Sequence, residues 1–340
     1  MKRRRALAVI FLVLLAAGAG AGWRQWRSLA QPVNAAAPLR FIVPPGARFL
    51  RVAAELEARG IIAAPRAWVL YARWKGVAAA IKAGEYEIEP GTTPRALLDK
   101  MVNGQVVLHS FTIVDGWRVE DMLAAMRRNP EVAVTLPEHP ADLMQSVGFS
   151  GLAAEGQFLP ETYRFPSGTS DVDLLRQAHA ALTRVLHAAW AARDPSVPLQ
   201  NADDLLIMAS IVEKESGLPE ELPKIAGLYL HRLRIGMRLQ ADPTVIYGLQ
   251  NGYDGTLHGV DLRNDGPYNT YTRRGLPPTP IALAGAAAIE ATARPENTDA
   301  LYFVASGNGG SHVFSATLDE HNAAVARYLA RTRQKPETTR

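Results

Sequence analysis

Three short apolar strands in the first half of the chain are each followed by a glycine-containing turn and a helix. The strands lie at 41–43, 86–88 and 111–114, and helices with apolar residues at i, i+3 and i+4 follow at 49–59, 94–102 and 119–128. A further helix is predicted at 65–75, and we expect its Trp68, Leu70, Tyr71 and Trp74 to lie in the core rather than on a ligand-binding face. Because strands and helices alternate at this scale, the pattern predicts one small α/β module over residues 40–130.

The second half of the chain predicts another module, over residues 150–335, with two notable helices. One, at 171–192, is long and amphipathic and serves as scaffold. The other, at 205–216, has Ser210 as its one polar residue between 205 and 212, so it must be buried. Asp203 and Asp204 are placed to cap its beginning, and Gly217 to close its end at the C′ position.

Charged residues appear only in the last turn of this buried helix, as Glu213, Lys214 and Glu215. Residues two apart point about 200° away from each other on a helix, so one glutamate can face solvent while the other is held at the inner edge. Burial and a helix C-terminus both raise the pKa of a carboxyl group. A raised pKa is what a general acid for a glycosidic oxygen needs. From these residues alone, a charged helix end in contact with water stays open as the other interpretation.

The loop at 155–165 combines two carboxylates, Glu155 and Glu161, with a glycine, a proline and three aromatic residues. Such a composition fits a sugar-binding loop. It also fits a surface turn whose aromatic side chains fill the core. The sequence leaves both interpretations open.

The N-terminus predicts a transmembrane helix at 6–23, an uncharged run of about the minimum length that spans a bilayer. Residues 1–5 would then be a cytoplasmic tail and 24–39 a linker. The small residues at 16–22 leave a cleaved signal peptide as the alternative. In either case the positive-inside rule sends the rest of the chain across the membrane.

Charge and composition narrow the function. The 340 residues carry a net charge of +4, and six cations and no acid lie within residues 1–27, so the remainder is near −2. The basic charge therefore favours a membrane surface and argues against nucleic acid as a partner. There is no cysteine, which excludes disulfides, thiolate metal sites and a cysteine nucleophile. The eight histidines lack metal-ligand spacing, and the common hydrolase and nucleotide-binding motifs are missing, so we expect no metal and no cofactor.

Several segments together resemble one family. They are 213–216 (EKES), 232–248 (RLRIGMRLQADPTVIYG), 268–271 (YNTY), 275–281 (GLPPTPI), the strand 301–305 with its turn 307–310, 312–314, and 321–322. In this order and spacing they are similar to the membrane-anchored endolytic murein (lytic) transglycosylases, the YceG-like family. The resemblance covers essentially the whole chain. It departs from the family at 157–159, where further aromatic residues are more usual.

The resemblance implies an α+β fold: an N-terminal transmembrane helix, a small LysM-like α/β module, and a mixed α/β catalytic domain with its catalytic glutamate at the C-terminus of a buried helix. It assigns the acid/base role to Glu215. The implied reaction cleaves the β-1,4 bond between N-acetylmuramic acid and N-acetylglucosamine, forms a 1,6-anhydro ring, and terminates the elongation of nascent strands. The candidate substrate-binding residues are Glu155, Glu161, Gln240, Asp242, Thr244, Tyr247, Asn269 and Tyr271. Each of them is also open to a structural role, and Asp242 before a proline could begin a turn.

The resemblance also implies a location and partners. The protein would be a single-pass protein of the cell inner membrane, with a cytoplasmic N-terminus and a periplasmic catalytic domain acting on peptidoglycan glycan strands. Peptidoglycan synthases stay open as partners. Two alternatives remain: a non-catalytic wall-binding or scaffold protein, and a water-using muramidase in which Glu161 or Asp242 is a second carboxylate.

Overall fold

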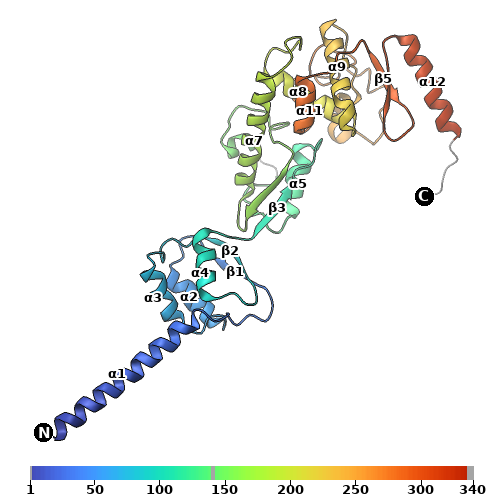
Figure 1. Ribbon diagram of the computed structural model, residues 1–340. Helices are drawn as coiled ribbons and strands as arrows, with labels where there is room; N and C mark the ends of the chain where they lie inside the picture. Colours follow the sequence, from blue (N-terminus) through green and yellow to red (C-terminus); the bar gives the residue numbers. More distant parts are fainter. Residues whose placement is uncertain (1, 139–141, 335–340) are drawn as a thin grey trace. The chain divides into compact units, whose positions relative to one another are not determined.

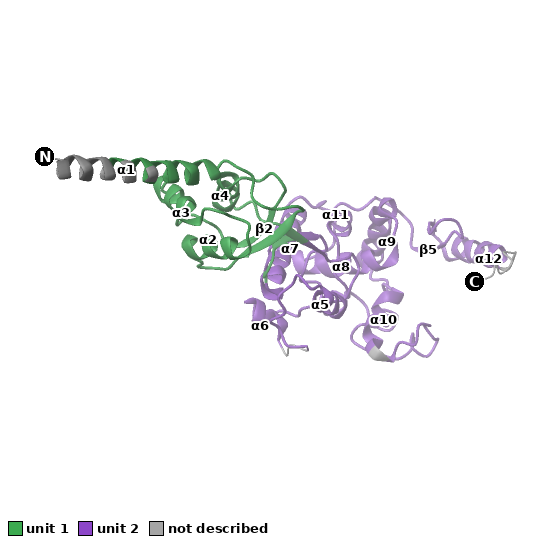
Figure 2. Ribbon diagram, turned by 90° about the horizontal axis from the view of Figure 1, so that it is seen from below, with its two compact units in different colours: residues 1–109, 164–169 green, residues 110–163, 170–340 purple. Residues whose placement is uncertain are grey.

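The computed structural model describes residues 2–138 and 142–334, which form two compact units. The first unit comprises residues up to 109 together with 164–169, and the second comprises 110–163 and the chain from 170 onward (Figure 2). Each unit has its own helices and strands (Figure 1). The expected mixture of helices and small sheets is therefore present.

The first unit contains the first two of the predicted strand–turn–helix repeats. Its elements are α1 (Lys2–Ser28), β1 (Leu39–Val43), α2 (Phe49–Ala58), α3 (Pro65–Trp74), β2 (Gly84–Ile88) and α4 (Pro94–Asn103). The strands β1 and β2 pair in antiparallel fashion, with Phe41 opposite Tyr86. Both of these aromatic side chains are fully buried, so the small sheet turns one face into the core of this unit.

Two of the four residues of helix α3 that were expected in the core lie there, and two do not. Trp68 is fully buried and donates a hydrogen bond from Nε1 to the carbonyl oxygen of Pro94 at 2.7 Å, and Tyr71 is also buried. Leu70 and Trp74 are exposed, so placing them in the core was wrong. The four positions span more than one face of the helix, and the core covers only one of them.

The segment 24–39 is not the simple linker that the sequence predicts. The helix α1 continues through it to Ser28, and Leu29 and Val33 are buried in the core of the first unit. The backbone N–H of Val33 also donates to the carbonyl oxygen of Thr92 at 2.7 Å. These apolar contacts fix the segment to the module that follows it.

The third predicted repeat, which the sequence assigned to a module ending at 130, lies mostly in the second unit. Its strand β3 (Leu108–Thr112) pairs with β4 (Thr162–Pro166) in a separate two-stranded sheet, and the chain passes between the units within these strands. Its helix α5 (Val119–Arg128) buries Met122, Leu123 and Met126. Periodicity locates an apolar face but does not tell which core that face covers.

Helices form the core of the second unit. The central ones are α7 (Asp171–Ala191), α8 (Ala202–Glu215), α9 (Leu222–Arg234) and α11 (Ala286–Ala293). The helix α11 packs against the other three, and α8 contacts both α7 and α9 (Figure 1). At the C-terminal end of the unit, β5 (Tyr302–Ala305) and β6 (His312–Ser315) form an antiparallel hairpin, and α12 (Leu318–Gln334) packs on both strands. The short helices α6 (Leu143–Val147) and α10 (Asp242–Leu249) complete the unit.

The predicted transmembrane segment 6–23 falls inside α1. Across residues 2–138 and 142–334, no helix combines the length and the apolar character needed to cross a membrane. The membrane anchor is therefore not confirmed.

Candidate active site

The helix α8 carries the candidate acid, and its position follows from burial and capping. Its eight residues from 205 to 212 are all buried, as the apolar run predicts. Ser210 is satisfied there, because its hydroxyl donates to the carbonyl oxygen of Ile207 and accepts from the backbone N–H of Ile281. The helix therefore cannot rotate without breaking these contacts, and its last turn is held in a fixed orientation.

Both ends of α8 differ from the sequence prediction in detail. Asn201 is the N-cap and accepts from the backbone N–H of Asp204 at 2.8 Å, so Asp203 and Asp204 lie in the first turn. At the other end Ser216 is extended and Gly217 does not adopt the left-handed conformation. The predicted glycine cap was wrong: the chain leaves the helix in an extended conformation directly after Glu215.

The carboxyl group of Glu215 is enclosed by protein, although the residue keeps some exposed surface at the cavities beside it. Tyr229 on α9 donates a hydrogen bond from its hydroxyl to Glu215 Oε1 at 2.5 Å. Burial is the largest influence and raises the pKa of Glu215 to about 7. The Tyr229 hydrogen bond and the Arg232 charge lower this pKa, and the negative charge of Asp242 raises it. Near neutral pH, both the acid and its conjugate base are therefore populated.

Glu215 lines two cavities of the second unit. The smaller, of about 340 Å³, is formed by side chains from α8, α9, α12, β5 and the segment 240–271. We call it the Glu215 cavity. Its lining residues are Glu215, Tyr229, Arg232, Gln240, Asp242, Tyr271, Tyr302, Phe303, Leu318 and His321. The larger, of about 600 Å³, includes Asp115, Glu213, Lys214 and Ser216 in addition to Glu215. Glu215 is the lining residue that these two cavities share.

The segment that carries Gln240 into this cavity is pinned from several directions. Arg232 donates hydrogen bonds to the carbonyl oxygens of Leu239 and Leu301, and Gln240 N–H donates to the carbonyl oxygen of Thr270 at 3.2 Å. Gln240 has a φ of 51°, in the left-handed region that non-glycine residues rarely adopt. Such a conformation costs free energy and persists because the neighbouring hydrogen bonds impose it.

Three of the predicted binding residues lie on the Glu215 cavity: Gln240, Asp242 and Tyr271. The hydroxyl of Tyr271 donates a hydrogen bond to Asp242 Oδ1, and the pair stands beside Glu215. Burial and the Asp242 carboxylate raise the pKa of Tyr271, which keeps the phenol protonated. The structure therefore brings together hydrogen-bonding groups from sequence positions 29 residues apart.

The sequence argument allowed one of the two glutamates to face solvent while the other is held at the inner edge, but both are half-buried. The Glu213 Oε2 accepts a hydrogen bond from the backbone N–H of Gly285 at 3.0 Å. Burial raises the pKa of Glu213, the Gly285 hydrogen bond lowers it, and the nearby charge of Asp115 raises it. The two glutamates still point apart: Glu215 is held by Tyr229, and Glu213 by Gly285.

Two of the predicted binding residues are buried structural residues. Thr244 is fully buried and hydrogen-bonds to Ala241 and Thr270. The Asn269 side chain donates to the carbonyl oxygens of Asp261, Leu262 and Asn264, and so holds a loop together. Neither residue lines the Glu215 cavity.

The aromatic residues of the loop at 155–165 fill the core, which was the alternative to a sugar-binding loop. Its aromatic residues Phe158, Tyr163 and Phe165 are buried in the core. Glu155 accepts from the backbone N–H of Val119 at the start of α5, and burial raises its pKa to about 7. Glu161 is exposed.

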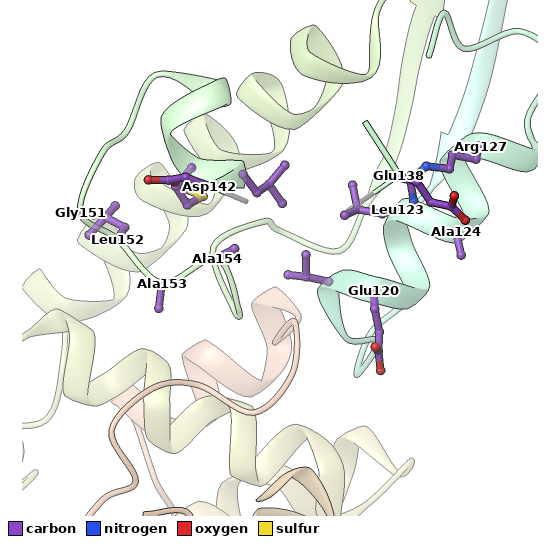
Figure 3. A pocket seen from close by; sticks show the side chains of 13 residues that line it. Glu120, Leu123, Ala124, Arg127, Glu138, Asp142, Gly151, Leu152, Ala153 and Ala154 are labelled. Atoms are coloured by element: carbon purple, nitrogen blue, oxygen red, sulfur yellow. The ribbon is translucent and has the colours of Figure 1, made fainter. Parts of the chain in front are cut away.

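Tyr247 lies with Glu155 rather than on the Glu215 cavity. The Arg118 guanidinium stacks over the Tyr247 ring, with 5.0 Å between its carbon and the ring centroid, and Tyr247 hydrogen-bonds to Glu155. A further cavity, of about 640 Å³, is lined by α5 and the segment 142–154 but not by Glu215 (Figure 3). None of the predicted site residues Glu155, Glu161 and Tyr247 lines the Glu215 cavity or the larger cavity beside it.

Several residues that the fold brings to Glu215 are not among the predicted site residues. They are Tyr229, Arg232, Tyr302, Phe303, Leu318 and His321. Arg232, Tyr302, Phe303 and His321 lie in the segments that resemble the family, where the sequence analysis gave them no individual role. Tyr229 lies in an apolar run of α9, where nothing in the local pattern separates it from core residues. A buried tyrosine needs a hydrogen-bond partner, which was the one available signal, but the partner is 14 residues away in the sequence.

The arrangement suits general acid–base chemistry on a bound polar ligand. A single enclosed carboxyl group with a pKa near 7 can both donate and accept a proton, and the surrounding phenols, amide and carboxylate can bind hydroxyl and amide groups. These properties define a candidate acid/base site with one central carboxyl group.

Comparison with known proteins assigns the family. The model of the YceG-like family matches residues 41–327, and the chain belongs to this family. An endolytic murein transglycosylase of Bacillus subtilis is 29% identical, over 93% of this chain and 92% of its own length. One of Streptococcus pneumoniae is 25% identical over 94% of this chain, which spans only 64% of that longer relative. The crystal structure of a putative YceG-like protein from Listeria monocytogenes is 27% identical, with a TM-score of 0.48, and covers 84% of this chain and 98% of its own.

Proposed function

We propose that the protein is a peptidoglycan lytic transglycosylase that cuts within glycan strands and uses Glu215 as its acid and base. The enzyme class rests on membership of the YceG-like family and on relatives named endolytic murein transglycosylases. The observation that carries the choice of residue is the position of Glu215, which lines both the Glu215 cavity and the larger cavity beside it. Burial raises the pKa of Glu155 to about 7 as well, but Glu155 lines neither of these cavities. We further propose that the bond cleaved is the β-1,4 bond between N-acetylmuramic acid and N-acetylglucosamine.

The proposed reaction needs one carboxyl group. Protonated Glu215 donates its proton to the bridging oxygen while the bond from that oxygen to the muramyl C1 breaks. The substrate's own acetamido group assists by stabilising the positive charge that develops at C1. The Glu215 carboxylate then takes the proton of the muramyl 6-hydroxyl, whose oxygen bonds to C1 and closes a 1,6-anhydro ring. The proton balance is closed, Glu215 is regenerated as the acid, and no water is consumed.

The surroundings of Glu215 support a polymeric substrate. Cutting within a strand requires sugars on both sides of the broken bond, and Glu215 lines two cavities. Gln240, Asp242 and Tyr271 offer an amide, a carboxylate and a phenol to the hydroxyl and acetamido groups of sugars in the Glu215 cavity.

The mass of the fragments tests this reaction. Incubation of purified, peptide-free glycan strands with the enzyme is expected to release fragments with 1,6-anhydromuramyl ends, which are one water lighter than hydrolysis products. A muramidase that uses water, with Asp242 as its second carboxylate, would instead give reducing ends. Fragments that are predominantly hydrolytic would refute the transglycosylase, and the absence of cleavage would favour a wall-binding protein.

We also propose that the enzyme lies at the inner membrane, where it would terminate the elongation of nascent strands. This location is supported by the cation-flanked uncharged run within α1 and by the fixed connection of α1 to the first unit. The catalytic unit would lie in the periplasm, the first unit would be a LysM-like module, and peptidoglycan synthases are candidate partners.

Deleting residues 1–27 tests the anchor. The full chain is expected to sediment with membranes at high salt, and the shortened chain to remain in the supernatant after ultracentrifugation. Membrane retention of the shortened chain would contradict α1 as the anchor.

A further inference from the structure

His321 is a residue of the Glu215 cavity to which neither the sequence analysis nor the proposed reaction gives a role. It lies in the first turn of α12 and lines the cavity together with Leu318, three residues earlier on the same helix. Its ring stacks on Tyr302, with 5.2 Å between the ring centroids and 25° between the ring planes. The position of the imidazole is therefore fixed by packing.

The two ring nitrogens of His321 have different surroundings. Nδ1 is buried and, within the part of the chain that the structure describes, has no hydrogen-bond partner. Nε2 is not among the buried atoms that lack a partner, so it is the accessible ring nitrogen of a residue that lines the Glu215 cavity. A buried N–H without a partner is less well tolerated than a buried acceptor. The favoured tautomer therefore leaves Nδ1 unprotonated and carries the hydrogen on Nε2.

The neutral form of the imidazole is favoured as well. Burial and the neighbouring Arg232 charge lower the pKa of His321. A charged imidazole would also place a second N–H at Nδ1, where no acceptor meets it. At neutral pH His321 thus offers the cavity one N–H donor.

We propose that His321 Nε2–H donates a hydrogen bond to the acetamido carbonyl oxygen of the sugar in the Glu215 cavity and so selects N-acetylated glycans. This inference rests on the proposed function. A carbonyl oxygen can only accept a hydrogen bond, so a residue that lines the Glu215 cavity must donate one. The acetamido group also ends in a methyl group, which needs an apolar contact, and Leu318 lies beside His321 on the same face of α12. A sugar hydroxyl, unlike a carbonyl oxygen, can donate a hydrogen bond to the carboxylate of Asp242.

Two substitutions separate the proposed hydrogen bond from simple ring packing. His321→Phe keeps a ring that can stack on Tyr302 but removes the N–H. His321→Gln removes the ring, and its side-chain amide can place an N–H near the position of Nε2. Both are combined with Glu215→Gln, so that binding is measured without cleavage, and thermal melting confirms that each variant is folded.

The probes are peptide-free glycan-strand fragments and the same fragments after chemical removal of their N-acetyl groups, and the readout is Kd by calorimetry. His321→Phe is expected to weaken binding of the acetylated fragments about tenfold, the value of one neutral hydrogen bond. Binding of the de-N-acetylated fragments is expected to change much less. His321→Gln is expected to retain most of the preference for acetylated fragments.

An unchanged preference in His321→Phe, or an equal loss for both kinds of fragment, would overturn the role of His321. So would loss of the preference in His321→Gln while His321→Phe retains it, because ring packing would then be responsible. Cleavage by the unsubstituted enzyme is scored separately. Failure of the proposed function would appear there as an absence of anhydro products and is thereby distinguished from failure of this inference.

Discussion

Glu215→Gln is expected to reduce the rate of glycan-strand cleavage by roughly 10²- to 10⁴-fold, the usual contribution of a general acid or base. Glutamine has nearly the same shape and can still accept the hydrogen bond from Tyr229, but it cannot supply or take up a proton. The measurement is the rate of release of soluble fragments from purified strands. Activity within a few-fold of the unsubstituted enzyme would remove Glu215 from the reaction.

Glu213→Gln is the matched control, since it makes the same chemical change two residues away on the same helix. Its carboxylate accepts a hydrogen bond from Gly285 N–H, and Glu213 lines the larger cavity but not the Glu215 cavity. We expect this variant to keep activity within about tenfold, well short of the loss expected of a general acid. A total loss would mean that the two glutamates act jointly or that the assignment is reversed.

Folding can be checked in the same pair of proteins. The folded-state pKa of Glu215, about 7, lies above the ordinary 4.5, so its protonated form favours the folded state. That contribution is complete below pH 4.5 and is lost as the pH rises through 7, a change of about 3 kcal/mol. Glutamine does not titrate. Glu215→Gln is therefore expected to unfold at a higher temperature than the unsubstituted enzyme at pH 8, which separates loss of chemistry from loss of fold.

The rate of cleavage is expected to fall about tenfold for each pH unit above pH 7. The acid must be protonated before the bond breaks, and Glu215, with a pKa of about 7, is mostly ionised above that pH. The measurement is kcat/KM on soluble strands from pH 5 to 9. A rate that is constant from pH 6 to 9 would contradict Glu215 as the acid.

Substitutions of two residues next to Glu215 are expected to shift, in opposite directions, the pH above which the cleavage rate falls. Asp242→Asn removes a negative charge that raises the pKa of Glu215, so the fall should begin at lower pH. Tyr229→Phe removes a hydrogen bond that lowers this pKa, so the fall should begin at higher pH. The pH at which the fall begins is compared, and not the maximal rate, because both side chains also line the cavity. Shifts of the same sign would mean that another group titrates.

Local patterns located the elements of this fold well, because each depends on neighbouring residues. The apolar run of α8 and the alternating strands and helices of the first unit are read from spacings of two to four positions. The division of the chain was predicted less well. The apolar face of α5 belongs to the second unit, and Leu29 and Val33 of the supposed linker belong to the first core. Which core an apolar face covers depends on distant residues.

The same distinction holds for the candidate site. The charged end of a buried helix made Glu213 and Glu215 candidates, and family resemblance then selected Glu215 and added Gln240, Asp242 and Tyr271. These three residues line one cavity together with Glu215. That resemblance could not separate them from Thr244 and Asn269, whose side chains are used within the fold. Tyr229 and His321 were missed because only tertiary packing brings α9 and α12 to the end of α8.

The most direct test of Glu215 as the acid is a structure of the Glu215→Gln protein with a bound, uncut glycan strand. We expect a bridging oxygen of the strand to lie within about 2.6–3.2 Å of the substituted side chain, the reach of a hydrogen bond. Sugars would occupy the Glu215 cavity and the larger cavity beside Glu213. A strand bound instead in the cavity of Figure 3, lined by α5 and residues 142–154, would contradict this role of Glu215.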